Sequence, residues 1–152
     1  MQALLLVVEL ALVDDDARRD LARGRAATAQ SDEGANFVAA KAVDGSAAYG
    51  AGLTYWGAGP LPQWWQVDLG SAYALSNVAV TNYADGTRYY QYTVSGSTDG
   101  VTWTPLASKS NTAVATWQGD SYAVTGVARY IRVTVTLNSA NTSGHLANVT
   151  VR

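Results

Sequence analysis

From residue 128 to residue 137 the chain reads Ala-Arg-Tyr-Ile-Arg-Val-Thr-Val-Thr-Leu, the clearest indication of fold class in the sequence. Aliphatic and polar side chains alternate strictly along its second half: Ile131, Arg132, Val133, Thr134, Val135, Thr136 and Leu137. A period of two places successive side chains on opposite faces of an extended strand. The stretch therefore predicts a β-strand whose aliphatic face, Leu137 included, lies in the core.

Shorter segments of the same character lie along the rest of the chain. Trp64 to Leu69 alternates in the same way, and the further expected strands are 77–82, 89–97, 102–106, 121–124 and 146–151, rich in Val, Thr and Tyr. Turn-forming pairs separate them: Asp44-Gly45, Asp85-Gly86, Asp99-Gly100 and Gly119-Asp120. No stretch after residue 25 has helical periodicity. About eight short strands predict an all-β, antiparallel β-sandwich.

The amino-acid composition excludes several classes of function. A length of 152 residues suits one domain with a real core, and 14% charged residues with a formal net charge of -2 give no basic excess for binding nucleic acid. The absence of cysteine excludes disulfides and thiolate chemistry. A single histidine, His145, excludes a metal centre built from several imidazoles.

The opening segment differs from the rest of the chain. An apolar run from Ala3 to Val13 is interrupted by Glu9, and Asp14-Asp15-Asp16 follows. It lacks the early positive charge of a signal peptide and is too short to span a bilayer. We assign 1–20 to an N-terminal extension or the remnant of an upstream element, and 21–152 to the domain. An unusual targeting segment remains the alternative.

Several motifs occur in a fixed order from Leu21 to Val151. They are Leu-Ala-Arg-Gly-Arg-Ala-Ala-Thr-Ala from 21, Lys-Ala-Val-Asp-Gly from 41, Thr-Tyr-Trp from 54, Gln-Trp-Trp-Gln-Val-Asp-Leu-Gly from 63, Ser-Thr-Asp-Gly-Val-Thr-Trp from 97 and Ala-Arg-Tyr-Ile-Arg-Val from 128. In this order they resemble the discoidin family, also called the F5/8 type C domain, and its sugar-binding branch, carbohydrate-binding module family 32. The resemblance implies a discoidin-like jelly roll that binds a ligand and carries out no catalysis.

The residues themselves also argue against an enzyme. A Ser-His-Asp arrangement would depend on His145 alone, and the chain has no Gly-x-Ser-x-Gly motif. A glycosidase needs two opposed carboxylates, whereas most carboxylates after residue 25 stand at turn positions, where turn chemistry explains them.

The resemblance also implies a structural Ca²⁺ ion. The matching donors are the Lys41 carbonyl, the Asp44 carboxylate, the Ser46 carbonyl, the Thr54 carbonyl and hydroxyl, and Ala147 and Asn148 of the last strand. This sequence departs from the family in two ways. The loop before Thr54 is longer than usual, so that another residue of 46–53 could take its role, and Asn148 stands where the family commonly has Glu. A metal-free Asp44-Gly45 turn is the alternative.

Aromatic residues separate into core and candidate ligand contacts. Trp65 lies on the apolar face of its strand, and Trp56 and Trp103 match family positions in the core or at its rim. Tyr49 and Tyr55 lie instead in the long loop 46–63, among small residues that would leave a ring exposed to stack on a sugar. Trp117, in a polar segment, is a further stacking candidate, the alternative being a cover for a sheet edge.

Polar candidates complete the expected binding site. Asn82, Asp85 and Arg88 share the loop 82–91, where the sugar-binding branch commonly places a ligand-binding Arg or Asn. An Arg fork suits vicinal hydroxyls or a uronate carboxylate, although an Arg88–Asp85 pair stabilising the turn is the alternative. His145 is a hydrogen-bonding candidate in the last loop or is simply solvated. That loop has Ser143 where the family often has an aromatic residue.

The leading hypothesis is a non-catalytic carbohydrate-binding module on a secreted, extracellular protein. It would tether a catalytic domain of the same polypeptide, from a bacterial glycan-active enzyme, to an oligo- or polysaccharide. The alternatives are a structural spacer and a discoidin domain that binds a protein or a cell surface. Membrane lipid is disfavoured because the loops offer Leu53 and Leu61 with few cations around them.

Overall fold

A computed structural model of the chain describes residues 19–45 and 54–152. Its elements are β1 (Ala27–Ala29), the short 3₁₀ helix η1 (Ala39–Ala42), β2 (Trp56–Ala58), β3 (Gln63–Ala74), β4 (Asn77–Thr81), β5 (Tyr90–Ser97), β6 (Thr104–Lys109), β7 (Asp120–Ala123), β8 (Val127–Asn138), β9 (Gly144–Leu146) and β10 (Asn148–Val151). The all-β prediction is confirmed. The sequence did not predict the very short strands β1 and β2, because three residues are too few to show alternation.

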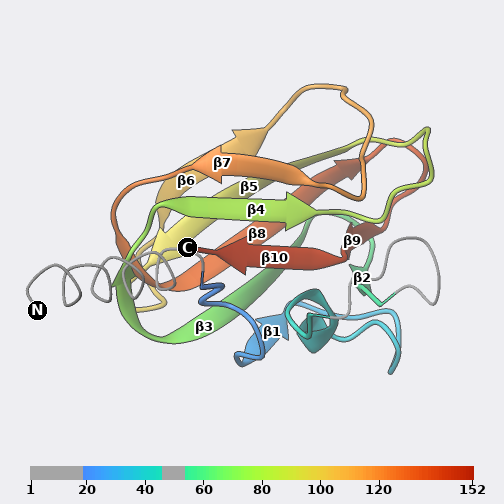
Figure 1. Ribbon diagram of the computed structural model, residues 1–152. Coiled ribbons are helices and arrows are strands. Elements are labelled where there is room, and N and C mark those ends of the chain that lie inside the picture. Colours follow the sequence, from blue (N-terminus) through green and yellow to red (C-terminus); the bar gives the residue numbers. More distant parts are fainter. Residues whose placement is uncertain (1–18, 46–53) are drawn as a thin grey trace, which may run out of the picture.

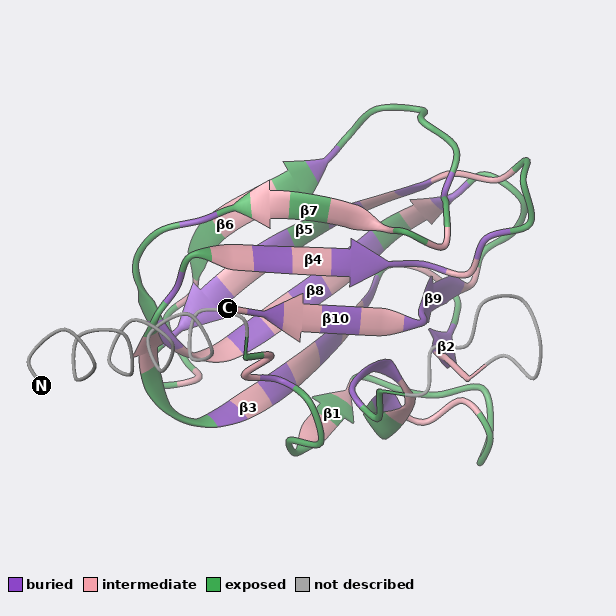
Figure 2. Cartoon of the chain, in the orientation of Figure 1, coloured by how far each residue is buried: buried purple, intermediate pink, exposed green. Residues whose placement is uncertain are grey.

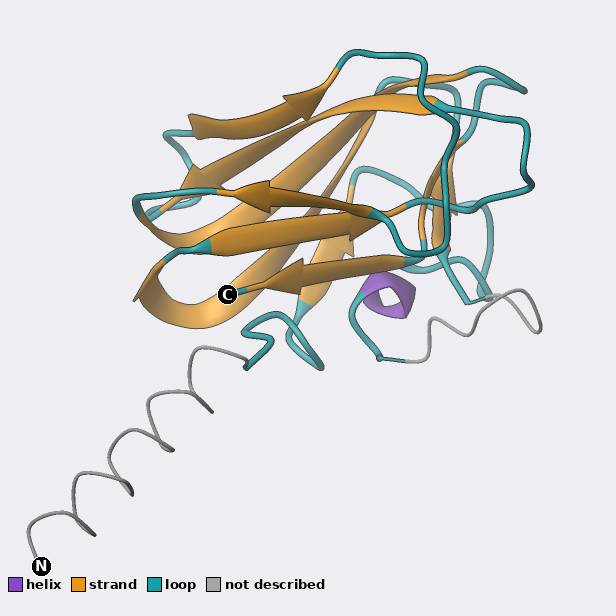
Figure 3. Ribbon diagram, turned by 45° about the horizontal axis from the view of Figure 1, so that its top comes forward, coloured by secondary structure: helices purple, strands orange, loops and turns teal. Residues whose placement is uncertain are grey.

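The strands form two facing layers and a small ribbon. A five-stranded sheet in the order β1-β3-β8-β5-β6 lies behind a three-stranded sheet in the order β10-β4-β7, and β2 pairs with β9 at one end (Figures 1 and 3). Every pairing is antiparallel. This arrangement is the antiparallel sandwich that the sequence predicts.

The core fills the space between the two layers. Ile131, Val133 and Val135 of β8 are fully buried, as the alternation predicts, and Val78 and Val80 of β4 are buried in the other sheet. Figure 2 shows the resulting alternation of buried and half-buried residues along these strands. Trp65 is also fully buried, and its indole N–H donates to the Ala39 carbonyl at 2.9 Å. Its assignment to the core is therefore confirmed.

The end of β8 corrects one expectation. Leu137 is only half-buried, whereas the next residue, Asn138, is buried. The cause is an irregularity in the pairing of β5 with β8, where Gln91 pairs with Leu137 but Tyr92 pairs with Val135. Such a bulge reverses which face each side chain occupies. Asn138 then uses its buried amide to bond Asn141 and the Ser143 carbonyl.

The start of the described chain is bound to its end. The Leu21 N–H donates to the Val151 carbonyl at 2.7 Å. One Asp20 carboxylate oxygen accepts the N–H groups of Val151 and Ala22, both at 3.0 Å. Asp20, which we place in the extension 1–20, thus contacts the sandwich. Most of that extension, residues 1–18, lies outside the described residues.

None of the helical segments in the described residues is long and apolar enough to cross a membrane.

Candidate functional site

Loops from both layers and the β2–β9 ribbon converge at one end of the sandwich, where β4 ends and β5 begins (Figure 1). Five aromatic or imidazole rings meet there, which we call the ring cluster: Phe37, Tyr55, Tyr83, Trp117 and His145.

The ring cluster is a connected network. The Tyr55 ring lies 5.0 Å from Phe37, 5.5 Å from Tyr83 and 5.1 Å from His145, measured between centroids. Tyr83 in turn lies 5.7 Å from Trp117 in an edge-to-face arrangement. These spacings are typical of favourable aromatic pairs. Phe37, Tyr55, Tyr83 and Trp117 are each only partly buried. They therefore keep apolar surface that a ligand can contact.

A glycine in β2 allows an acidic side chain to reach the rings. A Cβ on Gly57 would lie 2.9 Å from the Glu33 carboxylate, 3.3 Å from His145 and 3.4 Å from Tyr55. The Glu33 N–H donates to the Gly57 carbonyl at 2.8 Å, which fixes the segment carrying the carboxylate. Burial raises the pKa of Tyr55, and the charge of Glu33 raises it further. Glu33 therefore brings a negative charge to the edge of the ring cluster.

Arg88 supplies the positive charge. Its guanidinium carbon lies 5.0 Å from the centroid of Tyr83, and its Nε donates to Asp85 at 2.9 Å. The other Asp85 oxygen accepts the N–H groups of Arg88 and Thr87 at 2.9 Å and 3.0 Å. These backbone bonds, together with Arg88, hold the pKa of Asp85 well below its usual range. The turn therefore fixes Arg88 over Tyr83 and compensates its charge.

The base of the site is a buried hydrogen-bonded group. His145 is 7% exposed, and its Nδ1 lies 2.9 Å from the Tyr90 hydroxyl. The buried Asn82 amide donates to the His145 carbonyl at 2.9 Å. Burial lowers the pKa of His145 to about 4, a shift that the charge of Glu33 opposes and that of Arg88 assists. His145 is therefore neutral near pH 7.

The loop carrying Trp117 is held in place by three contacts. The buried Lys109 ammonium donates to the Ala113 carbonyl at 2.7 Å, and the Ala115 N–H donates to the Arg88 carbonyl at 2.9 Å. Gly119 adopts φ +73° and passes so close to the end of β4 that a Cβ would lie 2.6 Å from the Val80 carbonyl. Only glycine fits this close approach. These contacts place Trp117 beside Tyr83.

The structure brings together five of the seven predicted ligand residues: Tyr55, Asp85, Arg88, Trp117 and His145 surround Tyr83 or contact its neighbours. Asn82 lies beneath them, buried, and its amide holds β9 against the end of β4. One expectation differs from the structure: His145 is neither solvated nor in a loop but lies inside β9. Of the two alternatives for Asp85 and Arg88, the structure shows the pair that stabilises the turn. Tyr49 lies outside the described residues.

Sequence reasoning missed three contributors, namely Tyr83, Glu33 and Phe37. Tyr83 is central to the ring cluster and directly follows Asn82. It could have been predicted, because loop 82–91 was already a candidate binding loop. Glu33 and Phe37 lie in a loop before η1 whose sequence has no motif or alternation that would indicate a binding site. Only the pairing of that loop with Gly57, whose N–H donates to the Phe37 carbonyl at 3.1 Å, brings them to the site.

Some of the segments that carry the expected calcium donors pack together. The helix η1, which contains Lys41, packs against both β2 and β10, and β10 begins at Asn148. Among the described residues no cluster of three or more acidic or imidazole side chains could hold a metal. Asp44 supplies a carboxylate, and carbonyl oxygens would have to complete the shell. The Arg23 guanidinium lies against Gly45, which adds a positive charge nearby. Ser46 lies outside the described residues.

At one end of the β-sandwich, a partly exposed ring cluster lies beside a fixed Arg88 and a nearby Glu33. Such an arrangement is typical of binding modules that hold a small ligand on the loops of a rigid scaffold. Residues 41–133 match the model of an F5/8 type C family, which is described as a NedA-like, galactose-binding domain. The chain therefore belongs to the F5/8 type C family. The resemblance seen in the sequence is confirmed.

Solved structures place the chain among carbohydrate-binding modules. The family 32 module of AlyQ, in complex with 4,5-unsaturated mannuronic acid, is 29% identical over 84% of this chain and 93% of its own, with a TM-score of 0.73. Chitosan-binding module 1 of a chitosanase/glucanase from Paenibacillus sp. IK-5 is 30% identical over 87% of this chain and 96% of its own, also with a TM-score of 0.73.

Whole enzymes match only in part. The family 89 glycoside hydrolase of Clostridium perfringens is 28% identical with a TM-score of 0.76, and the match covers 88% of this chain but only 14% of the enzyme. Isolated modules match over nearly their full length, so the chain is a non-catalytic carbohydrate-binding module. No match was found among curated protein sequences.

Proposed function

We propose that the ring cluster is the glycan-binding site and that the domain tethers a secreted bacterial glycan-active enzyme to its polysaccharide. The observation that carries the proposal is the meeting of Tyr55, Tyr83 and Trp117 with Arg88 and Glu33 at one loop end. Rings bind the apolar faces of sugars, and the charged groups can bond their hydroxyls. The attached enzyme would gain by avidity, because even weak binding raises its local substrate concentration.

The charges of the site favour a neutral or amino sugar over a uronate. The charge of Arg88 is compensated by Asp85, and within the described part of the chain Glu33 has no ion-pair partner. A uronate carboxylate would therefore meet a site that is negative overall. An ammonium group of an amino sugar would instead pair with Glu33.

A glycan panel tests this proposal. The purified domain would be titrated calorimetrically with galactose, chitotriose and alginate oligosaccharides. We expect saturable binding of a neutral or amino sugar and weaker binding of the alginate oligosaccharides. If the alginate oligosaccharides bind best, the charge argument is wrong. If no sugar on a broad panel binds, the spacer or protein-binding alternative replaces the proposal.

Tethering has its own test. The parent enzyme, with and without this domain, would be assayed on soluble and on insoluble polysaccharide. Avidity predicts a loss of rate on the insoluble substrate alone when the domain is removed.

We also propose that the Asp44 loop binds a structural Ca²⁺ ion, supported by the packing of η1, which contains Lys41, against both β2 and β10. The ion, when bound, would join η1 to β2 and β10. At free calcium of ten times its Kd we expect the free energy of unfolding to rise by about 1.4 kcal/mol, which raises Tm by a few degrees. Thermal unfolding with calcium and with EDTA measures the shift.

A matched pair of variants locates the effect. Asp44→Asn should abolish the calcium-dependent rise in Tm, whereas Asp99→Asn, in the similar Asp99-Gly100 turn, should retain it. Equal Tm values in calcium and EDTA for the native chain would mean that the Asp44-Gly45 turn is metal-free.

A further inference from the structure

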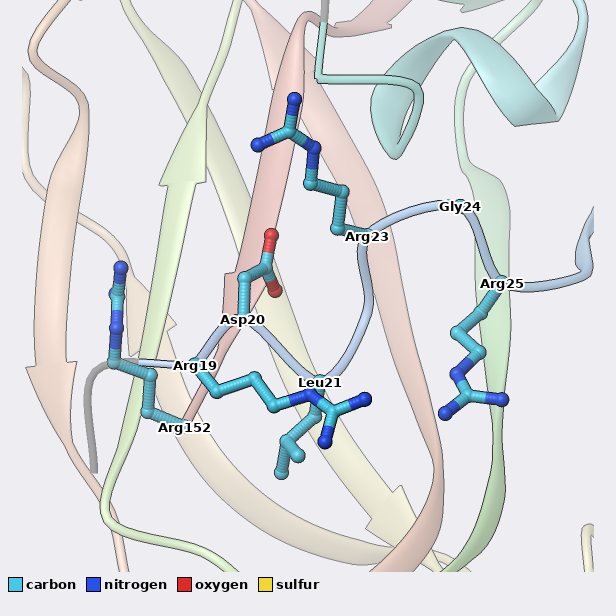
Figure 4. A pocket seen from close by; sticks show the side chains of 7 residues that line it. All are labelled: Arg19, Asp20, Leu21, Arg23, Gly24, Arg25 and Arg152. Atoms are coloured by element: carbon cyan, nitrogen blue, oxygen red, sulfur yellow. The ribbon is translucent and has the colours of Figure 1, made fainter. Parts of the chain in front are cut away.

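A second concave site lies at the other end of the sandwich, where the described chain begins and ends. It is a pocket of about 640 Å³ lined by Arg19, Asp20, Leu21, Arg23, Gly24, Arg25 and Arg152. Figure 4 shows the four arginine side chains arranged around Asp20 and Leu21. The ring cluster lies at the opposite end (Figure 1), so the two sites are separate.

The backbone that forms this pocket is fixed. Leu21 is bonded to the Val151 carbonyl, as described above, and the Gly24 N–H donates to the Val43 carbonyl at 2.7 Å. The Arg25 N–H closes a turn on the Ala22 carbonyl at 3.0 Å, and Ala22 itself is fully buried. The arginines are therefore carried by a fixed segment, which lowers the entropy cost of binding a ligand.

Two of the guanidinium groups lie beside glycine turns. Arg23 lies against Gly45, and a Cβ on Gly70 would lie 3.1 Å from Arg25. The lining thus contains four guanidinium groups and one carboxylate in a chain whose net charge is -2. That carboxylate, Asp20, already accepts two backbone N–H groups. The pocket is a concentrated positive charge on an otherwise acidic domain.

We propose that this arginine pocket binds a sulfate ester group of an acidic glycan. A guanidinium fork suits oxyanions, and the several oxygens of a sulfate can bond more than one arginine. The volume lies in the range of ligand sites that hold a small molecule. Leu21 is the only large apolar side chain in the lining, whereas membrane binding needs apolar anchors among the cations, so a glycan fits better than a lipid surface. The proposal does not depend on the ring cluster.

The test measures binding of the whole chain to dextran sulfate, with neutral dextran, inorganic sulfate and phosphatidylserine vesicles as separate arms, at about 0.15 M salt. We expect saturable binding of dextran sulfate and none of neutral dextran. The double variant R19Q/R152Q should weaken that binding about tenfold, as expected for the loss of two charge pairs at the surface. R129Q, which removes one arginine outside the pocket, should change it much less. Circular dichroism checks that each variant is folded.

The outcomes separate this pocket from the ring cluster. W117A should leave dextran sulfate binding unchanged, whatever it does to neutral sugars. Inorganic sulfate should compete with dextran sulfate in the native chain. Dextran sulfate binding no stronger than that of neutral dextran would overturn the proposal. So would equal losses in R129Q and in the double variant, or binding of vesicles in preference to dextran sulfate.

Discussion

Trp117→Ala is expected to weaken glycan binding by about tenfold to a hundredfold, because burying an aromatic face contributes on the order of 1.5–3 kcal/mol. Trp117 lies 5.7 Å from Tyr83 and is only partly buried, so its ring both supports Tyr83 and offers surface to a sugar. Isothermal titration with the best ligand from the glycan panel measures the loss.

Trp103→Ala is the matched control. Trp103 is also partly buried, but it packs against Arg132, whose guanidinium carbon lies 4.2 Å from its centroid and 4.4 Å from that of Trp64. Arg132 and Trp64 belong to the five-stranded sheet, and among the described residues this stack makes no ring contact with the ring cluster. We expect Trp103→Ala to lower Tm while leaving affinity unchanged. Native affinity in Trp117→Ala would move the binding site away from this end of the sandwich.

Stability is expected to fall by about 3 kcal/mol between pH 6.5 and pH 4 because of His145. Burial lowers the pKa of His145 from 6.5 to about 4 in the folded chain. Between these values the unfolded chain binds a proton that the folded chain does not, so that protonation favours unfolding. The stabilisation is complete above pH 6.5 and is lost as the pH falls toward 4. Urea unfolding at several pH values measures the slope.

His145→Gln supplies the comparison. Glutamine does not titrate, so the variant should show a much flatter pH dependence between 6.5 and 4.5, even though loss of the Tyr90 contact lowers its stability at every pH. The carboxylates of Asp68, Asp85 and Asp99 have lowered pKa values, so their effects fall at lower pH. The same slope in both proteins would show that His145 is not the titrating group.

The sheet strands were largely predictable from local sequence. The alternation from Ile131 to Val135 is a local property, and one buried face is enough to orient it. The prediction was wrong at Leu137 because a bulge depends on the partner strand β5 and not on β8 itself. Of β9, the sequence places Leu146 in the expected strand 146–151 but Gly144 and His145 in the last loop, because three residues show no alternation. Pairing with β2 makes all three a strand.

The site was predictable only in part. Arg88 and Asp85 are three residues apart, and the sequence left open both ligand binding and an internal pair; the structure shows the pair, with 2.9 Å between Nε and the carboxylate. The sequence places Asn82 among the ligand-binding candidates of loop 82–91, but its side chain is buried because β9 passes beside it and offers the His145 carbonyl.

Local sequence was enough to predict the sandwich and the family, since alternation, turn pairs and the order of short motifs are properties of neighbouring residues. Which side chains form the site depends on tertiary packing. Glu33, Tyr55 and His145 lie far apart in the chain, and they meet because Gly57 leaves room between them and because β2 and β9 close that end. Tertiary packing likewise gathers Arg19 and Arg152 into one pocket, because β10 ends beside the first described residues. Contacts of this range depend on packing between elements, which no local pattern records.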